Sequence, residues 1–168
     1  MADQTLRLPA SFEEAIRPYE RELMRFVLRM SGNRDDALEL FQETCLRAYR
    51  AYPRVSNVEG IRPWLYRIAT NLCRNFARDK ARRTRVIVDA SVNHREPAAP
   101  GTDARHDLAA VRTLIAALPY KQREALTMRK VAGLGYGQIA QALGCSVEGA
   151  RANVSQAIRK LRAEWNRL

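Results

Sequence analysis

The chain has 168 residues, of which 46% are hydrophobic, enough for one ordinary domain or two small ones with a buried core. Lys and Arg number 29 against 18 Asp and Glu, so the net charge of +11 favours a polyanion such as nucleic acid over an acidic small molecule as the partner. This composition excludes a disordered tail, and no apolar run approaches the ~20 residues of a membrane span, so we expect a cytoplasmic protein without membrane insertion.

The cysteines and histidines give no metal or redox pattern. Cys45, Cys73 and Cys145 are far apart and lack a Cys-x-x-Cys pair, which favours reduced thiols over a disulfide framework. His94 and His106 have no cysteine at metal-ligand spacing. We therefore predict no metal site and no cofactor.

Apolar residues repeat at intervals of three and four along almost the whole chain, which predicts an all-α protein. Ser11 with Glu14 forms a capping-box pattern that opens a first helix. Pro18 separates this helix from a second one, which runs to about Met30 and ends at Gly32 and Asn33.

A third helix is predicted from Asp35 to about Tyr52, and it is acidic along one side. A metal site in a helical bundle would need histidines as well as carboxylates, and the N-terminal half contains no histidine. Two interpretations stay open for this helix: a docking surface for another protein, or a solvated face.

The fourth predicted helix, from about Gly60 to Arg83, is strongly basic. Residues 61–85 carry 8 basic and 1 acidic side chains, whereas residues 1–60 carry 9 and 10. One face is an apolar stripe that includes Trp64, and we expect Tyr66 to be more open. The other face could neutralise phosphates and offer an amide to a base, although a solvated face is the alternative. Its residues are Arg67, Asn71, Arg74 and Arg78.

Helical periodicity is lost in the segment RVIVDASVNHREPAAPGTD, which contains two prolines and a glycine. We interpret residues 86–104 as a flexible linker between two small helical domains, residues 1–85 and residues 105–168. Further helices are predicted at about 104–118, 120–131, 136–143 and 147–165.

The last two predicted helices form a helix-turn-helix pattern. Gly144 can take the left-handed conformation that ends a helix, and Ser146 is placed to cap the next one. The last helix has a small apolar face, and its opposite face carries basic and hydrogen-bonding side chains that can reach DNA. Two ordinary core helices would look similar, but 10 basic against 3 acidic residues in 111–168 favour DNA binding.

The combined pattern resembles a bacterial RNA polymerase sigma factor. RDDALELFQETCLRAYRAYP followed by IRPWLYRIATNLCRNFARDKARR resembles sigma domain 2, a helical bundle. LPYKQREALTMRKVAGLGYGQIAQALGCSVEGARANVSQAIRKLRAEW resembles the helix-turn-helix of sigma domain 4. With no third domain between them, the chain is similar to the extracytoplasmic-function, or group IV, sigma factors. The resemblance covers about residues 11–85 and 107–165.

The resemblance implies a non-enzymatic function, in which the chain binds core RNA polymerase and directs promoter recognition, strand opening and transcription initiation. The implied partners are core polymerase, promoter DNA in duplex and single-stranded form, and an anti-sigma factor. The acidic helix would bind polymerase through Asp36, Leu40, Gln42, Glu43, Thr44 and Arg47. The unpaired minus-ten strand would bind Ser56, Asn57, Arg67, Asn71, Arg74 and Arg78. The duplex minus-thirty-five element would bind Arg151, Ala152, Ser155, Gln156 and Arg159.

Two rival functions belong to other classes. A stand-alone helix-turn-helix regulator would bind duplex DNA tightly without polymerase, whereas a sigma factor binds promoters well only as holoenzyme. A helical enzyme would need a nucleophile, a base and an orienting group, and the sequence shows no such arrangement.

Overall fold

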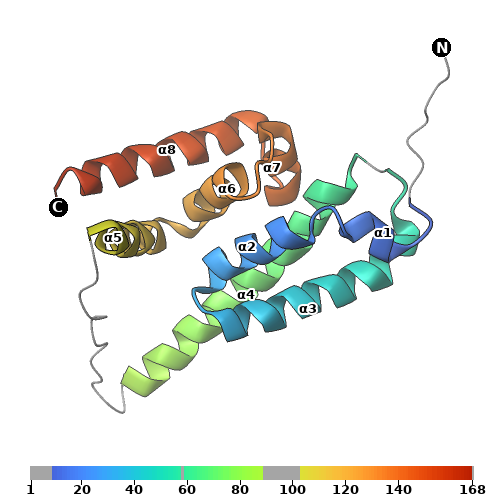
Figure 1. The fold of residues 1–168 in the computed structure, drawn as a ribbon, viewed down its shortest axis with the longest axis horizontal. Helices are drawn as coiled ribbons and strands as arrows, with labels where there is room; N and C mark the ends of the chain where they lie inside the picture. The colour runs from blue at the N-terminus through green and yellow to red at the C-terminus, as the bar shows by residue number, and fades with distance from the viewer. Residues whose placement is uncertain (1–8, 58, 89–102, 168) are drawn as a thin grey trace.

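The computed structural model describes residues 9–57, 59–88 and 103–167, and every regular element in these ranges is a helix. The all-α prediction is therefore confirmed (Figure 1). The elements are α1 (Phe12–Ile16), α2 (Glu20–Ser31), α3 (Arg34–Ala51), the short 3-10 helix η1 (Tyr52–Arg54), α4 (Ile61–Val88), α5 (Asp103–Ala117), α6 (Tyr120–Lys130), α7 (Tyr136–Leu143) and α8 (Val147–Trp165).

Local sequence signals set the boundaries of these helices. The Ser11 Oγ accepts a hydrogen bond from the Glu14 N–H and caps α1, and the Asn33 Oδ1 accepts one from the Asp36 N–H at 2.8 Å and caps α3. Gly32 ends α2 with a φ of 89°, a left-handed conformation that glycine adopts without steric cost. The predicted breaks in the N-terminal half are therefore found where the capping residues stand.

The segment between α4 and α5 is shorter than the predicted linker of residues 86–104. Helix α4 continues to Val88 and α5 already begins at Asp103, so both ends of the predicted segment are helical. The arginine- and valine-rich end of α4 contains no glycine or proline that would stop it. The middle of the predicted linker, including His94, lies outside the described residues.

The N-terminal half packs α2, α3 and α4 around a shared apolar core. Its fully buried side chains include Leu23, Phe26 and Leu65, and the ring of Tyr66 packs edge-on against Phe26 with centroids 5.2 Å apart. Tyr66 is 0% exposed, so the expectation that it is more open than Trp64 is wrong. Trp64, on the predicted stripe, is the half-buried one.

The C-terminal half packs α6 and α7 against α8. Met128 of α6, Ile139 of α7 and Val154 of α8 are buried in this core. Gly144 has a φ of 65° and ends α7, and the Ser146 Oγ accepts a hydrogen bond from the Gly149 N–H at 3.0 Å. The predicted turn of the helix-turn-helix is confirmed at both residues.

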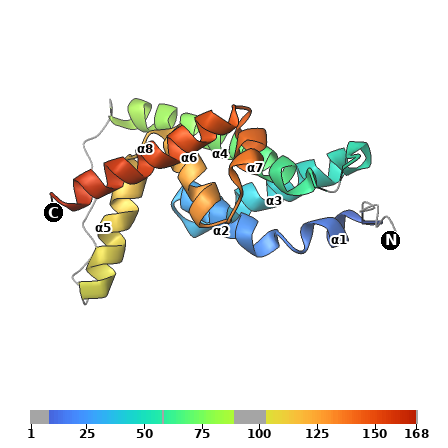
Figure 2. The same cartoon turned by 90° about the horizontal axis from the view of Figure 1, so that it is seen from above.

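The two halves pack directly against each other. Helices α2 and α4 lie between α3 on one side and α6 and α7 on the other (Figure 1), with α4 contacting α7 and α2 contacting α6. Helix α8 lies along the edge of the molecule away from α3 (Figures 1 and 2). Both predicted helical domains are present, but they are not loosely tethered in this structure, because they share one continuous buried core.

Candidate nucleic-acid and polymerase interfaces

Helix α4 has a packed side and an exposed side. At 100° per residue, Arg67, Asn71, Asn75 and Arg78 fall within a sector of about 80°, and all four are exposed. The Arg78 Nη2 donates to the Asn75 Oδ1 at 3.0 Å, so these two side chains support each other along the face. Three of the four residues predicted on this helix, Arg67, Asn71 and Arg78, therefore share one solvent-facing strip with Asn75.

Arg74 lies at the edge of that strip and points into the other half of the molecule. Its Nε and Nη2 donate to the Oε1 and Oε2 of Glu124 on α6, both at 2.7 Å. The Glu124 side chain is 0% exposed, whereas the Arg74 side chain is 35% exposed. The prediction that Arg74 lies free on the strand-binding face is therefore wrong for this arrangement, because the buried carboxylate occupies its guanidinium.

Burial and the partner arginine act in opposite directions on the pKa of the buried carboxyl in this pair. Burial raises the pKa of the Glu124 carboxyl, and the hydrogen bonds and charge of Arg74 act against that rise. The hydrogen bond to Glu124 raises the pKa of Arg74. The carboxylate thus depends on Arg74 to compensate for the loss of water.

The loop before α4 carries the other residues predicted for minus-ten DNA. Ser56 and Asn57 are both exposed, and the Asn57 Oδ1 accepts from the Glu59 N–H at 2.9 Å. Asn57 also borders a polar cavity of about 590 Å³ whose far wall belongs to α7. This cavity is lined by Tyr19, Asn57, Glu59, Gly60, Arg62, Gly137, Gln138 and Gln141.

Helix α8 presents all five of its predicted DNA contacts to solvent. Arg151, Ala152, Ser155, Gln156 and Arg159 are exposed, while Ala150, Val154 and Ala157 on the opposite side are buried. Gln156 also accepts a hydrogen bond from the Gln122 Nε2 at 2.8 Å, which ties this face to α6. The helix-turn-helix therefore offers its outer face unobstructed by the rest of the described chain.

A tyrosine connects two arginines beside this face. The guanidinium carbon of Arg151 lies 5.4 Å from the centroid of the Tyr136 ring, and that of Arg129 lies 4.9 Å from the same centroid. Both distances are within the range of cation–π attraction. Tyr136, which the sequence did not single out, thus restrains the orientation of Arg151.

The six residues predicted to bind polymerase lie on two different sides of the acidic helix α3. Leu40 and Thr44 are buried, and the Thr44 hydroxyl donates to the Leu40 carbonyl at 2.6 Å. They lie on the packed side of α3 together with Ala37 and Ala48, at intervals of three and four. The expectation that their side chains face a partner is therefore corrected.

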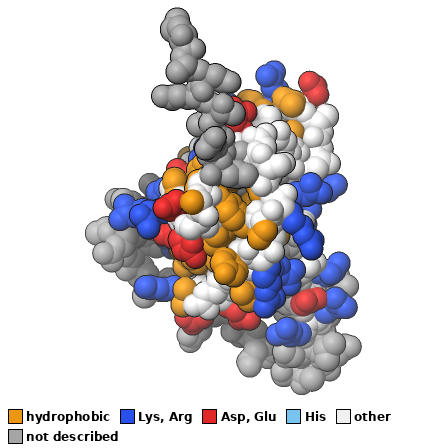
Figure 3. Space-filling view, turned by 90° about the vertical axis from the view of Figure 1, so that its right-hand side faces the viewer, with side chains coloured by type: hydrophobic (Ala, Val, Ile, Leu, Met, Phe, Trp, Pro, Cys, Tyr) orange, Lys and Arg blue, Asp and Glu red, His pale blue; other side chains and the backbone are white. Residues whose placement is uncertain are grey.

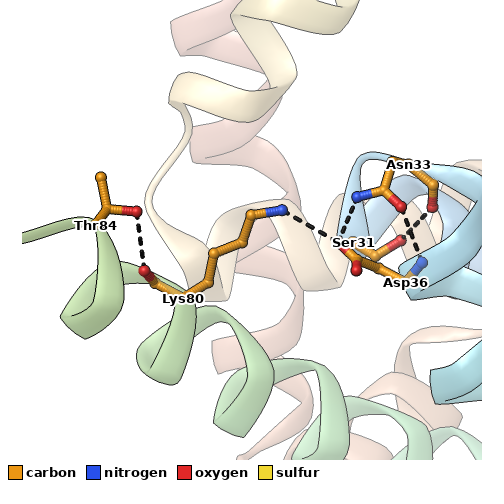
Figure 4. Close-up of polar contacts among 5 residues, drawn as sticks. All are labelled: Ser31, Asn33, Asp36, Lys80 and Thr84. Carbon is orange, nitrogen blue, oxygen red and sulfur yellow. Dashed lines mark hydrogen bonds and ion pairs between the residues drawn. The ribbon is translucent and has the colours of Figure 1, made fainter. Parts of the chain in front are cut away.

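The remaining four of these residues reach solvent. Gln42 and Arg47 are exposed, and the Arg47 Nε pairs with the Glu43 Oε1 at 2.6 Å. Asp36 is held by Asn33 and by the Lys80 Nζ at 3.1 Å, which ties the start of α3 to α4 (Figure 4). Leu38, Leu46 and Tyr49 add exposed apolar surface to α3.

The remaining features of the molecule are its surface charge, its possible metal ligands, the hydropathy of its helices and its thiols. Figure 3 shows Lys and Arg side chains on both sides of a face whose middle is hydrophobic. Within 9–57, 59–88 and 103–167, no cluster of His, Cys, Asp and Glu could hold a metal, and no helix is long and apolar enough to span a membrane. Burial raises the pKa of the Cys73 thiol to about 12, so this thiol is protonated at neutral pH.

Sequence reasoning missed the residues that join the two halves. One of them is Glu124. The other is Arg62, whose Nη2 donates to the Glu22 Oε2 at 2.7 Å and to the Ala132 carbonyl. Glu124 is one of only 3 acidic residues in 111–168, and a lone acid in the middle of a helix was the available signal. Arg62 stands beside the apolar stripe and gave no signal of its own.

Comparison with known proteins identifies the family to which the two halves of the chain are similar. Residues 15–83 match Sigma-70 region 2, and residues 108–161 match Sigma-70, region 4. The chain is 35% identical to the ECF RNA polymerase sigma factor SigC of Mycobacterium tuberculosis, over 92% of this chain and 83% of that protein. It is 33% identical to the ECF RNA polymerase sigma factor EcfG of Rhodopseudomonas palustris, over 84% and 77%.

Another relative is longer than this chain, and a further similar protein has a solved structure. The ECF RNA polymerase sigma factor SigG of Mycobacterium tuberculosis is 32% identical over 87% of this chain, which spans about half, 48%, of that relative's length. The sigma factor RpoE of Bartonella quintana, solved with the anti-sigma factor NepR, has the same fold with a TM-score of 0.70 at 23% identity, over 90% of this chain and 94% of that one. The chain therefore belongs to the ECF family of RNA polymerase sigma factors.

Proposed function

We propose that this protein is a sigma factor that binds bacterial core RNA polymerase and directs promoter recognition, strand opening and transcription initiation in the cytoplasm. The observation that carries the proposal is the presence, in a chain of this family, of two separate exposed basic faces, one on α4 and one on α8. One is suited to an opened strand and the other to a duplex. The protein itself performs no bond chemistry in this account.

The strip on α4 supports binding of the unpaired minus-ten strand. Arg67 and Arg78 lie on either side of Asn71 along the helix, so the guanidiniums can neutralise phosphates while the amide pairs with a base edge. The loop residues Ser56 and Asn57 lie before the start of the same helix. Extruding a base costs a few kcal/mol of stacking, which these contacts would offset.

The outer face of α8 supports reading of the minus-thirty-five element as duplex. A recognition helix enters the major groove, where small side chains such as Ala152 and Ser155 allow close approach and Arg151 can donate two hydrogen bonds to a guanine. All three side chains are exposed. A stand-alone regulator would use the same helix without the strand-binding face on α4.

The exposed side of α3 supports docking on the polymerase. Asp36, Gln42, Glu43 and Arg47 combine charged and amide groups with the apolar surface of Leu38, Leu46 and Tyr49. Mixed surfaces of this kind are typical of protein interfaces. An anti-sigma factor is a further proposed partner, since RpoE of Bartonella quintana was solved with NepR, and CnrH with the cytosolic domain of CnrY.

Run-off transcription with purified core polymerase on a genomic fragment library tests this function. We expect discrete transcripts whose start sites share an upstream sequence of two separated elements. Core polymerase alone is the control, and it should give none of these transcripts. Duplex binding by the free protein as tight as that of its mixture with core polymerase would support the stand-alone regulator instead.

A further inference from the structure

The Gln156 side chain on the outer face of α8 is oriented by a buried residue of α6. Its Oε1 accepts a hydrogen bond of 2.8 Å from the Gln122 Nε2. Gln122 is only 9% exposed, whereas Gln156 is exposed, so the bond joins the core of the C-terminal half to its surface. Within the described residues, the Gln156 side chain makes no other hydrogen bond. The direction of its amide is therefore set from inside the protein.

The bond decides which end of the Gln156 amide faces away from α6. A glutamine amide has a carbonyl, which accepts hydrogen bonds, and an NH2 group, which donates two. The two groups are fixed in one plane and diverge from the same carbon atom. Because the carbonyl is directed at Gln122, the NH2 group is directed away from α6. Gln156 therefore offers donors to a partner, while its acceptor is engaged within the protein.

Gln122 is placed to hold this orientation and does little else. It lies in the first turn of α6, a helix that packs against α8. Its own Oε1 is buried and has no hydrogen-bond partner among the described residues. An apolar side chain of the same length would therefore cost little stability here, because it would remove an unpaired buried carbonyl along with the one hydrogen bond.

The orientation of Gln156 determines which base pair it can read. A free glutamine pairs with adenine through both groups, since its carbonyl accepts from N6 and its NH2 group donates to N7. An amide that offers only donors finds two adjacent acceptors, N7 and O6, on guanine. In an A·T pair, the adenine N6 amino group is itself a donor and stands between the acceptors N7 and O4. The oriented amide therefore favours G·C over A·T.

We propose that Gln122 is a positioning residue for sequence recognition, which binds the Gln156 carbonyl and thereby makes Gln156 selective for a G·C pair in the minus-thirty-five element. The inference rests on the proposed function in that it takes the outer face of α8 as the face that reads duplex DNA. Gln122 itself is buried and acts only through Gln156. A Gln156 released from Gln122 has both groups free and selects an A·T pair.

The test is selection of promoters by holoenzyme from a library randomised across the minus-thirty-five element, followed by sequencing. Q156A identifies the base pair that Gln156 reads, as the position whose preference is lost. There the wild type should select G·C over A·T by about fivefold, the lower end of the range for a good base contact. Q122M keeps the length of the side chain but has no amide, and it should select A·T by about tenfold, because the released Gln156 pairs through both groups.

Two further variants separate positioning from a structural role. Q141M makes the same chemical change at an exposed position of α7 and should keep the wild-type preference. The double variant Q122M/Q156A should select like Q156A alone. A purely structural role of Gln122 would lower affinity for every sequence alike and leave the preferred pair unchanged. If circular dichroism shows that Q122M is unfolded, Q122A takes its place, since alanine also lacks a donor.

A wild-type preference for A·T at the Gln156 position would overturn the proposal. The same preferred pair in Q122M, or its replacement, and in Q141M would also overturn it. So would a Q156A variant that loses preference at no position, because Gln156 would then read no base. A wild type that enriches no element at all would contradict the proposed function, whereas enriched elements with an unchanged preferred pair would contradict this inference alone.

Discussion

The two basic helices of this protein differ in what the rest of the chain does to them. Helix α8 presents all its predicted DNA contacts to solvent, whereas α4 presents three of its four and directs Arg74 to a buried glutamate. Both helices carry arginines next to small or amide side chains, so their sequences alone do not separate them. The difference shows that the availability of a basic face depends on the partner that tertiary packing places beside it.

The largest expected effect concerns the packed side of α4. Replacing Tyr66 by alanine removes a fully buried ring from its contact with Phe26, and we expect a loss of about 3–5 kcal/mol in the free energy of unfolding. Urea denaturation followed by circular dichroism measures it. The matched control on the exposed side, Asn71→Ala, should change stability by less than about 0.5 kcal/mol. Equal effects would contradict the division of α4 into two sides.

On α8 we expect a sequence-specific loss. Arg151→Ala should weaken holoenzyme binding to the minus-thirty-five element by about 1–3 kcal/mol if the contact to a base is bidentate. The measurement is binding to promoters mutated one base pair at a time. Arg112→Ala, at an exposed position of α5, is the charge-matched control. A loss that is equal for every promoter variant would show a phosphate contact instead.

On the exposed side of α4, Asn71→Ala should impair opening and discrimination at one minus-ten base. The expected cost is of the same order, about 1–3 kcal/mol, because the amide can pair with one base edge. Permanganate reactivity of unpaired thymines measures opening. Affinity for core polymerase should stay nearly unchanged, and a parallel loss of that affinity would refute the role of this residue.

The smallest expected effect concerns Tyr136, which sharpens the comparison on the side of α8. Tyr136→Leu removes the cation–π contact that orients Arg151 and should weaken duplex binding by about 0.5–1 kcal/mol. A double-mutant cycle tests the mechanism. In the background of Arg151→Ala, the leucine substitution should have no further effect, whereas an additive loss would mean that Tyr136 acts independently.

The sequence predicts the local features of this fold well. Gly144 and Ser146 define the helix-turn-helix through backbone conformation and capping, which depend on the residues themselves and their near neighbours. The break at Pro18 and the helical spans follow from the same short-range rules. The predicted linker was too long because α4 extends beyond the apolar stripe used to define it.

The residues that the sequence misassigned are those whose neighbours come from a distant segment. A stripe at intervals of three and four indicates one packed face, but α4 packs on α2, α3 and α7. Tyr66 contacts Phe26 of α2, whereas Arg74 pairs with Glu124 of α6. Thr44 is polar yet buried, because its hydroxyl donates a hydrogen bond to the Leu40 carbonyl on the preceding turn of α3. The spacing of the apolar residues alone predicts neither the several packing partners of α4 nor the burial of Thr44.

Photocrosslinking in the open promoter complex tests the central claim, that one basic face binds an unpaired strand while the other binds duplex. A photoreactive phenylalanine derivative is placed at Arg67 on α4 or at Ser155 on α8, and the attached DNA strand is mapped. We predict that the α4 probe attaches only to the non-template strand of the minus-ten element and the α8 probe to paired DNA near minus thirty-five. Attachment of the α4 probe to duplex, or of the α8 probe to the opened strand, would contradict the account.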